Sequence, residues 1–204
     1  IMSKSKSISY FIMSKSKSIS LKDFESKLIK DLKDPFKQNK AFEILLDKYK
    51  EKVYFQIRRI VLNHDDTDDI LQNVFIKVFR GIKGFKGESK LSTWIYRIAY
   101  NESINFLKLK EKKYFYSSEI MMNTMVNNLR EDPYFDGDEV ELKLQGIISR
   151  LPKQQKIVFQ MKYFQELKFR EISEILGVTT GALKASFHLA KQKIIKELKS
   201  NQTF

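Results

Sequence analysis

The chain has 204 residues, of which 42% are hydrophobic, and it carries a formal net charge of +13 with no cysteine. This length allows one medium or two small packed domains, while the lack of cysteine excludes disulfides, zinc fingers and thiol catalysis, and no apolar run approaches the roughly 20 residues that span a bilayer. The basic charge predicts a polyanionic partner, either nucleic acid or an anionic membrane, although a lysine-rich proteome would also produce it.

Residues 1–20 hold the nonapeptide IMSKSKSIS twice, separated by Tyr10 and Phe11. A short repeat of serine and lysine has no apolar face to bury, so we expect a disordered tail. The duplication is also what an artefact of the expressed sequence or of the chosen start codon would produce, with Met13 as the native start. We therefore leave the tail out of the fold prediction.

Two helices are predicted next. The first has apolar residues spaced by four from Phe24 to Leu32 and is interrupted by Asp34-Pro35. The second has a three-four apolar period from Phe42 to Val61, and we expect Asn63 and His64 to end it.

An acidic run, Asp65, Asp66, Asp68 and Asp69, opens a third predicted helix. Carboxylates in a first turn are favoured by the helix dipole and by capping, which is a purely structural reading. A metal site would need a histidine or a distant carboxylate that the pattern lacks, so we predict none. A docking patch for a basic protein surface is the third reading, and Gln72 and Asn73 on the same helix favour it.

Residues 81–110 contain the only tryptophan. Gly81, Gly84 and Gly87 break the preceding helix and leave a basic loop, after which Ser92 or Thr93 is predicted to cap a long helix. Cations, short polar groups and a large aromatic side chain are what unstacked bases bind. The candidate positions on this helix are Trp94, Arg97, Asn101, Asn105 and Lys108. For Trp94, core packing competes with base stacking as the explanation, and both can hold.

Acidic residues outnumber basic ones between 111 and 140, whereas basic residues dominate on either side. We predict a flexible acidic linker at 113–138. Helices follow at 139–200, where Pro152 suits a helix start and Gly177 separates a short helix from a longer one. This helix-turn-helix pattern would place its second helix in a major groove, with hydrogen-bond donors at Thr180, Lys184, Ser186, His188 and Lys191. The prediction is an all-α fold of two small helical domains joined by the linker.

In order, these motifs resemble those of the bacterial RNA polymerase sigma factors of the extracytoplasmic-function (ECF) type, from about Lys40 to Leu198 apart from the linker. DDTDDILQNVFIKVFRGI resembles the helix that docks on the clamp helices of core RNA polymerase. FKGESKLSTWIYRIAYNESINFLK resembles the stretch that melts and reads the downstream (minus-ten) promoter element. ISRLPKQQKIVF with FREISEILGVTTGALKASFHLAK resembles the domain that reads the upstream (minus-thirty-five) element. The resemblance implies a region-2-like domain at 21–112 and a region-4-like helix-turn-helix domain at 139–200.

The resemblance also implies three sets of site residues. Those facing the polymerase would be Asp66, Asp68, Asp69 and Gln72. Those serving the downstream element and melting would be Lys86, Ser89, Lys90, Thr93, Trp94, Arg97, Asn101, Asn105 and Lys108. Those facing the upstream element would be Arg170, Thr179, Thr180, Lys184, Ser186, His188 and Lys191. The chain departs from the common family residues at Asn73, Asn105, Ser186 and Leu189, and the last two replace arginines, which weakens the usual phosphate and guanine contacts.

A sigma factor of this kind would be a cytoplasmic protein without enzymatic activity, cofactor, metal or direct membrane insertion. The partners implied are core RNA polymerase, through its clamp helices and the flap of the beta subunits, promoter DNA in double- and single-stranded form, and an anti-sigma factor. The residues by themselves leave two other functions open. One is a stand-alone helix-turn-helix transcriptional regulator, and the other is a nuclease that uses the acidic run, although the dispersed acids and histidines of such a site are lacking.

Overall fold

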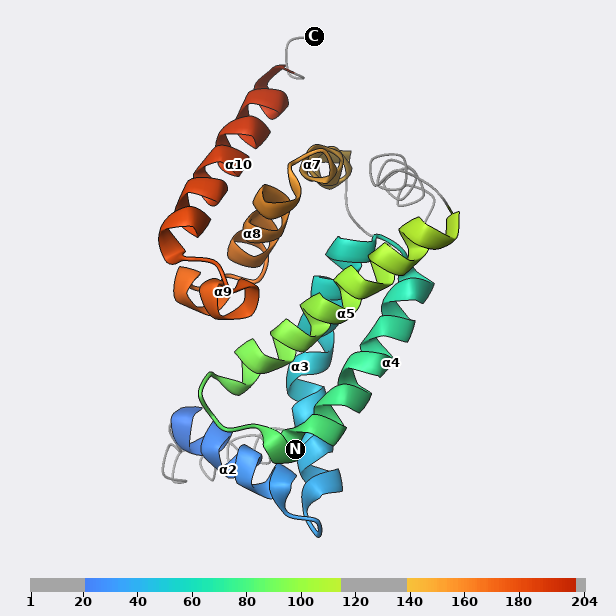
Figure 1. The fold of residues 1–204 in the computed structure, drawn as a ribbon, viewed down its shortest axis with the longest axis vertical. Helices are drawn as coiled ribbons and strands as arrows, with labels where there is room; N and C mark the ends of the chain where they lie inside the picture. Colours follow the sequence, from blue (N-terminus) through green and yellow to red (C-terminus); the bar gives the residue numbers. More distant parts are fainter. Residues whose placement is uncertain (1–20, 115–138, 201–204) are drawn as a thin grey trace, which may run out of the picture. The chain divides into compact units, whose positions relative to one another are not determined.

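The computed structural model describes residues 21–114 and 139–200, and all regular structure in these ranges is helical (Figure 1). The all-α prediction is therefore confirmed. Within the same ranges, no helix combines the length and the apolar character needed to cross a membrane. The predicted tail at 1–20 and nearly all of the predicted linker at 113–138 lie outside the described residues.

Two compact units divide the chain at Leu45 and Leu46. The described part of the first unit holds α2 (Leu21–Lys33) and the start of α3 (Gln38–Val61). Asp34 makes the turn between these helices, because its carboxylate accepts from the backbone N–H of Phe36 at 2.9 Å and its carbonyl from that of Gln38 at 2.8 Å. The division falls inside α3, so it does not coincide with the predicted domains 21–112 and 139–200, which stay a prediction.

In the second unit, the end of α3 is followed by α4 (His64–Gly81), the short 3-10 helix η1 (Ile82–Gly84) and α5 (Leu91–Tyr114). Helices α4 and α5 pack against each other. Their buried side chains are Ile70, Leu71, Val74, Phe75 and Val78 on α4 and Leu91, Ile95, Tyr96 and Ala99 on α5. Gln56, which is 1% exposed, donates from Nε2 to the Tyr96 carbonyl at 3.0 Å and so ties α3 to α5.

Two helix starts differ from the sequence prediction. Asn63 and His64 do not end α3 but begin α4, because the Asn63 side chain accepts from the backbone N–H of Asp66 at 2.8 Å and forms the N-cap. Helix α5 begins at Leu91, so Ser92 and Thr93 lie inside its first turn rather than before it. Asparagine is as favourable at the N-cap as aspartate, but the sequence prediction considered only the acidic run as the start of this helix.

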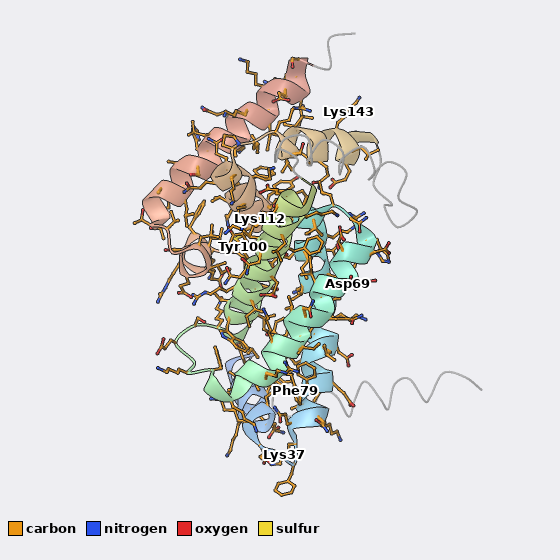
Figure 2. The ribbon with its side chains drawn as sticks, turned by 45° about the vertical axis from the view of Figure 1, so that its right-hand side comes forward. Lys37, Asp69, Phe79, Tyr100, Lys112 and Lys143 are labelled. Carbon is orange, nitrogen blue, oxygen red and sulfur yellow. The ribbon has the colours of Figure 1, made fainter. Side chains whose placement is uncertain are left out.

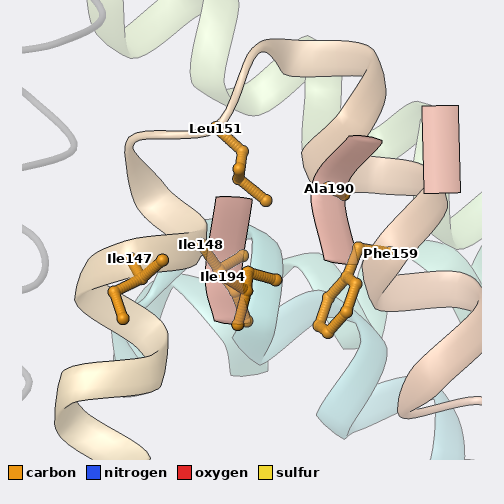
Figure 3. Packing of buried hydrophobic residues seen from close by; sticks show 6 residues of the cluster. All are labelled: Ile147, Ile148, Leu151, Phe159, Ala190 and Ile194. Carbon is orange, nitrogen blue, oxygen red and sulfur yellow. The ribbon is translucent and has the colours of Figure 1, made fainter. Parts of the chain in front are cut away.

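The rest of the second unit comprises α7 (Glu139–Ser149), α8 (Lys153–Tyr163), α9 (Phe169–Leu176) and α10 (Thr180–Ser200). Its core brings α7, α8 and α10 together, as Figure 3 shows for Ile147, Ile148, Leu151, Phe159, Ala190 and Ile194. Helix α9 ends at Leu176 and is capped by Gly177, whose φ of 68° lies in the left-handed region that favours glycine. The predicted helix, glycine turn and helix are confirmed.

Lys156, in the first turn of α8, gives a test of this packing. No acidic residue shares that turn, and burial lowers the pKa of Lys156 from 10.5 to about 8. The unfolded chain therefore holds this proton up to a higher pH, and stability rises as the pH increases from about 8 to 10.5. We expect Lys156→Met to raise the free energy of unfolding at pH 7 by about 1–2 kcal/mol and to remove that rise. Urea denaturation at several pH values measures both, with the exposed Lys153→Met as the matched control. An equal rise in the free energy of unfolding at pH 7 in both variants would contradict the burial argument.

Candidate nucleic-acid interface

The loop from Phe85 to Leu91 is anchored at both ends and exposed between them. Phe85 is 6% exposed and Leu91 fully buried, whereas Lys86 and Lys90 are exposed. The turn needs glycine at position 87, where φ is 76°. The buried side chains of Phe85 and Leu91 therefore fix the two ends of the loop, and the exposed residues between them include two lysines.

Trp94 supports the base of this loop. Its ring lies 5.2 Å, centroid to centroid, from that of Phe85. A Cβ atom added at Gly81 would stand only 3.3 Å from its Cζ2 atom, so the end of α4 approaches the indole closely. The side chain remains partly exposed, and both sequence interpretations, packing and an accessible edge, are compatible with its position.

One face of α5 carries the polar and basic positions. Trp94, Arg97, Asn101, Asn105 and Lys108 follow each other at three or four residues, which places them on a single stripe, the reading stripe. Ile95, Ala99 and Ser103, all fully buried, occupy the opposite face. Asn101, Asn105 and Lys108 are exposed, and the stripe continues from the loop for about four helical turns.

Two residues predicted for the same site have other positions. Thr93 is 1% exposed and its hydroxyl has no hydrogen-bond partner, so it lies under the surface rather than on it. Ser89 is half-buried and donates from its hydroxyl to the Lys90 carbonyl at 3.3 Å. Thr93 is therefore assigned to packing beneath the loop.

The acidic helix offers fewer free carboxylates than its sequence suggests. Asp66 pairs with Lys110 of α5 at 2.6 Å, and Asp68 lies 3.4 Å from the His64 ring. Asp69, labelled in Figure 2, and Gln72 are exposed. Within residues 21–114 and 139–200, no group of three or more acidic or histidine side chains is arranged to hold a metal ion.

The helix-turn-helix exposes most of its predicted contact residues. Thr180, Lys184, His188 and Lys191 lie on the outer side of α10, and the Arg170 side chain of α9 is 88% exposed. Ser186 is only partly exposed. Thr179 accepts at its hydroxyl from the Ala182 N–H at 3.4 Å, so it caps α10.

Sequence reasoning missed two residues of α9 that contact the end of the loop and the start of α5. Glu171 pairs through Oε1 with Lys90 Nζ at 2.5 Å, and the Glu174 carbonyl accepts from the Arg97 guanidinium. Burial raises the pKa of Glu171, but its hydrogen bonds and the nearby charges of Lys90 and Lys168 outweigh this and hold the pKa below its ordinary value. No local pattern indicates contacts between residues about 80 positions apart.

Two sequence families match the chain. The first, Sigma-70 region 2, covers residues 45–113, and the second, Sigma-70, region 4, covers residues 141–194. The first range contains the loop, the reading stripe and the acidic helix. The second contains the helix-turn-helix.

Curated relatives cover most of the chain. The ECF RNA polymerase sigma factor SigW of Bacillus subtilis is 32% identical over 167 residues, which span 78% of this chain and 89% of that protein. An ECF RNA polymerase sigma-E factor of Haemophilus influenzae is 29% identical over 164 residues, with 76% and 86% covered.

Two solved structures share the fold. The sigma factor RpoE of Bartonella quintana, in complex with the anti-sigma factor NepR, has a TM-score of 0.63 at 16% identity and covers 78% of this chain and 98% of that one. CnrH, in complex with the cytosolic domain of CnrY, has a TM-score of 0.65 at 15% identity, with 87% and 99% covered.

Proposed function

Because this chain belongs to the ECF sigma factors of bacterial RNA polymerase, we propose that its loop and reading stripe melt and read the downstream promoter element while α10 reads the upstream one. As a sigma factor, the chain binds core RNA polymerase and directs promoter recognition. The observation that carries the proposal is the reading stripe, which continues an anchored basic loop along one face of α5.

For the downstream element, we assign a role to each residue from the exposure of its side chain. Lys86 and Lys90 hold backbone phosphates, and the loop between the anchors receives an unstacked base. Asn101 and Asn105 offer amide groups to base edges, and Lys108 extends the phosphate contacts. Unstacking a base costs a few kcal/mol, and capture returns about 1–3 kcal/mol per base, so the polymerase must supply the remaining grip on DNA.

For the upstream element, the exposed donors of α10 face the major groove. Lys184 and Lys191 suit phosphates or guanine acceptors, and Thr180 and His188 suit base edges. Arg170, at the start of α9, lies on the surface where it can hold a phosphate. Because Ser186 is partly buried, we expect it to contribute less to binding of the upstream element than the sequence alone implied.

Polymerase docking is assigned to Asp69 and Gln72, which are exposed on α4. Asp66 acts mainly within the chain, since Lys110 already neutralises it, and Asp68 lies beside His64. The similar sigma factor RpoE of Bartonella quintana was captured with the anti-sigma factor NepR, which supports the proposal that this chain also binds an anti-sigma factor. We further propose a cytoplasmic protein without catalytic activity, as expected for a recognition subunit.

Run-off transcription with core polymerase on a randomised promoter library tests the function. The full chain is expected to give core-dependent initiation from a defined set of sequences. The stand-alone regulator would instead bind one duplex tightly by itself and leave core polymerase unstimulated. Metal-dependent cleavage of the DNA, lost with changes at Asp68 and Asp69, would favour the nuclease.

The docking assignment is tested by Asp69→Lys. We expect this variant to need about tenfold more protein, or more, for half-maximal transcription, because a like charge facing a basic surface is repelled. Asp47→Lys is the matched control, since Asp47 is also exposed on a helix of the same unit and undergoes the same charge change. Competition against the unmodified chain for core polymerase gives the ratio directly. Equal losses in the two variants would show a general charge effect and remove Asp69 from the interface.

A further inference from the structure

Two adjacent lines of exposed residues run along the first half of α10, on the side away from its core. The buried residues that define the core side are Leu183, Ala190 and Ile194. The polar line consists of Lys184, His188 and Lys191. The apolar line consists of Gly181, Ala185 and Leu189. Residues three or four positions apart share a helix face, so the apolar line is a continuous strip without side-chain donors or acceptors over about two helical turns.

Leu189 is the large side chain of the apolar line, and it is 47% exposed. Among the described residues, the partly buried apolar side chains that pack on the core of α7, α8 and α10 are Leu144, Phe164, Phe187 and Leu198. Leu189 is not one of them. Its apolar surface is therefore available to a partner, and we expect a change at this position to leave the fold intact.

The charges around Leu189 indicate that this partner is DNA rather than an apolar protein surface. Lys193 follows Leu189 by one turn, and Lys184 and Lys191 lie on the neighbouring line. No acidic residue occurs in α10 before Glu197. Lysine is depleted from the centres of protein interfaces, whereas phosphates border a major groove on both sides and pair with it. An apolar partner would desolvate these cations without pairing them.

The bases differ in what they present to a leucine in the major groove. Guanine presents two acceptors, cytosine a donor and adenine one of each, whereas thymine adds a C5-methyl group to its acceptor. A leucine against a polar base edge displaces water without replacing its hydrogen bonds, which is unfavourable. Against the thymine methyl group it buries apolar surface on both partners. Leu189 therefore favours thymine by attraction and also by exclusion of the other bases.

We propose that Leu189 packs on the C5-methyl group of a thymine in the upstream element and makes this base pair a specificity-determining position. The inference rests on the proposed function, because it needs α10 to lie in the major groove. Lys184 and Lys191 hold the flanking phosphates, and the small side chain of Ala185 lets the base edge approach the helix. The element carries thymine at the position where an arginine in place of Leu189 would select guanine.

Deoxyuridine substitution tests the methyl contact with the full chain and core polymerase. Run-off transcription from promoters with a randomised upstream element first defines the selected sequence. Each thymine of that element is then replaced by deoxyuridine, which lacks only the C5-methyl group. At one thymine we expect initiation at limiting protein to fall about three- to fivefold, the factor for one buried methyl group. In the Leu189→Ala chain the same replacement should have no further effect. Equal falls in the two chains, or no sensitive thymine, would contradict the contact.

Leu189→Arg tests the base preference itself. Because arginine pairs with both acceptors of guanine, the variant is expected to select guanine over thymine at this position, with the ratio changed at least about fivefold. Ile195→Arg is the matched control, since Ile195 is 41% exposed on the same helix and undergoes the same change. It should strengthen binding to every sequence through phosphates and leave the base preference unchanged. The same shift in both variants, or none in Leu189→Arg, would overturn the proposal.

The two measurements separate this inference from the proposed function. Initiation that depends on the upstream sequence, but neither on the thymine methyl group nor on the side chain of Leu189, would refute only the role of Leu189. Core-dependent initiation that is indifferent to the upstream sequence would refute the reading by α10 on which the inference rests.

Discussion

Trp94→Ala is expected to lower the free energy of unfolding by about 2–3 kcal/mol and to reduce promoter opening at least tenfold. Fully buried tryptophans cost about 3–5 kcal/mol when truncated, and this one is partly exposed. The change removes the Phe85 ring pair and the packing against Gly81. The loop then loses its support, although Lys86 and Lys90 are still present. Urea denaturation followed by circular dichroism measures stability, and permanganate reactivity of promoter thymines with core polymerase measures opening.

The control is Trp94→Phe, which keeps a ring against Phe85. If Trp94 acts mainly as an anchor, phenylalanine restores most of the stability and most of the opening together. A phenylalanine variant that is stable but fails to open DNA would assign the indole to a base instead. An alanine variant as stable as the unmodified chain would show that the loop does not depend on this contact.

Much of the fold follows from local patterns. The apolar period between Phe42 and Val61, the glycine at position 177 and the spacing along α5 each depend on neighbours within a few residues, so the sequence suffices to predict them. The helix starts at Asn63 and Leu91 were missed because several polar residues in each stretch could serve as caps. Only the three-dimensional arrangement decides which side chain reaches the free N–H groups.

The candidate site was predictable only where it depends on residues close together in the sequence. The residues of the reading stripe are spaced by three or four positions, so the sequence alone predicts that they share one helix face. The partners of Asp66, Lys90 and Arg97 are 44, 81 and 77 residues away, and chain topology alone brings them close. Sequence reasoning therefore placed Asp66 at an external interface, whereas its carboxylate is already paired with Lys110. The burial of Thr93 was likewise not visible locally.

Phe159→Ala is expected to cost about 3–5 kcal/mol, the largest stability loss we predict. Phe159 is 4% exposed and lies in the core of α7, α8 and α10. Its ring stacks at 5.1 Å on Tyr163 and at 5.8 Å on Phe187. Because whole domains are stable by only about 5–15 kcal/mol, the helix-turn-helix should lose its fixed geometry. Thermal denaturation followed by circular dichroism gives the loss, and transcription from promoters that require the upstream element should fall with it.

Tyr163→Ala is the matched control, since it removes one stacking partner from a side chain that is 57% exposed and should cost below about 1 kcal/mol. We expect the Phe159→Ala chain still to be retained by core polymerase, because α4 and α5 share a separate set of buried residues. Three polar links oppose this expectation: Gln160 donates to the Arg59 carbonyl of α3 at 2.8 Å, Lys90 pairs with Glu171, and Arg97 donates to the Glu174 carbonyl. Each contributes about 1 kcal/mol or less, too little to carry the unfolding of α8 into α3 and α5. Loss of polymerase binding together with upstream recognition would show instead that the second unit unfolds as one cooperative body.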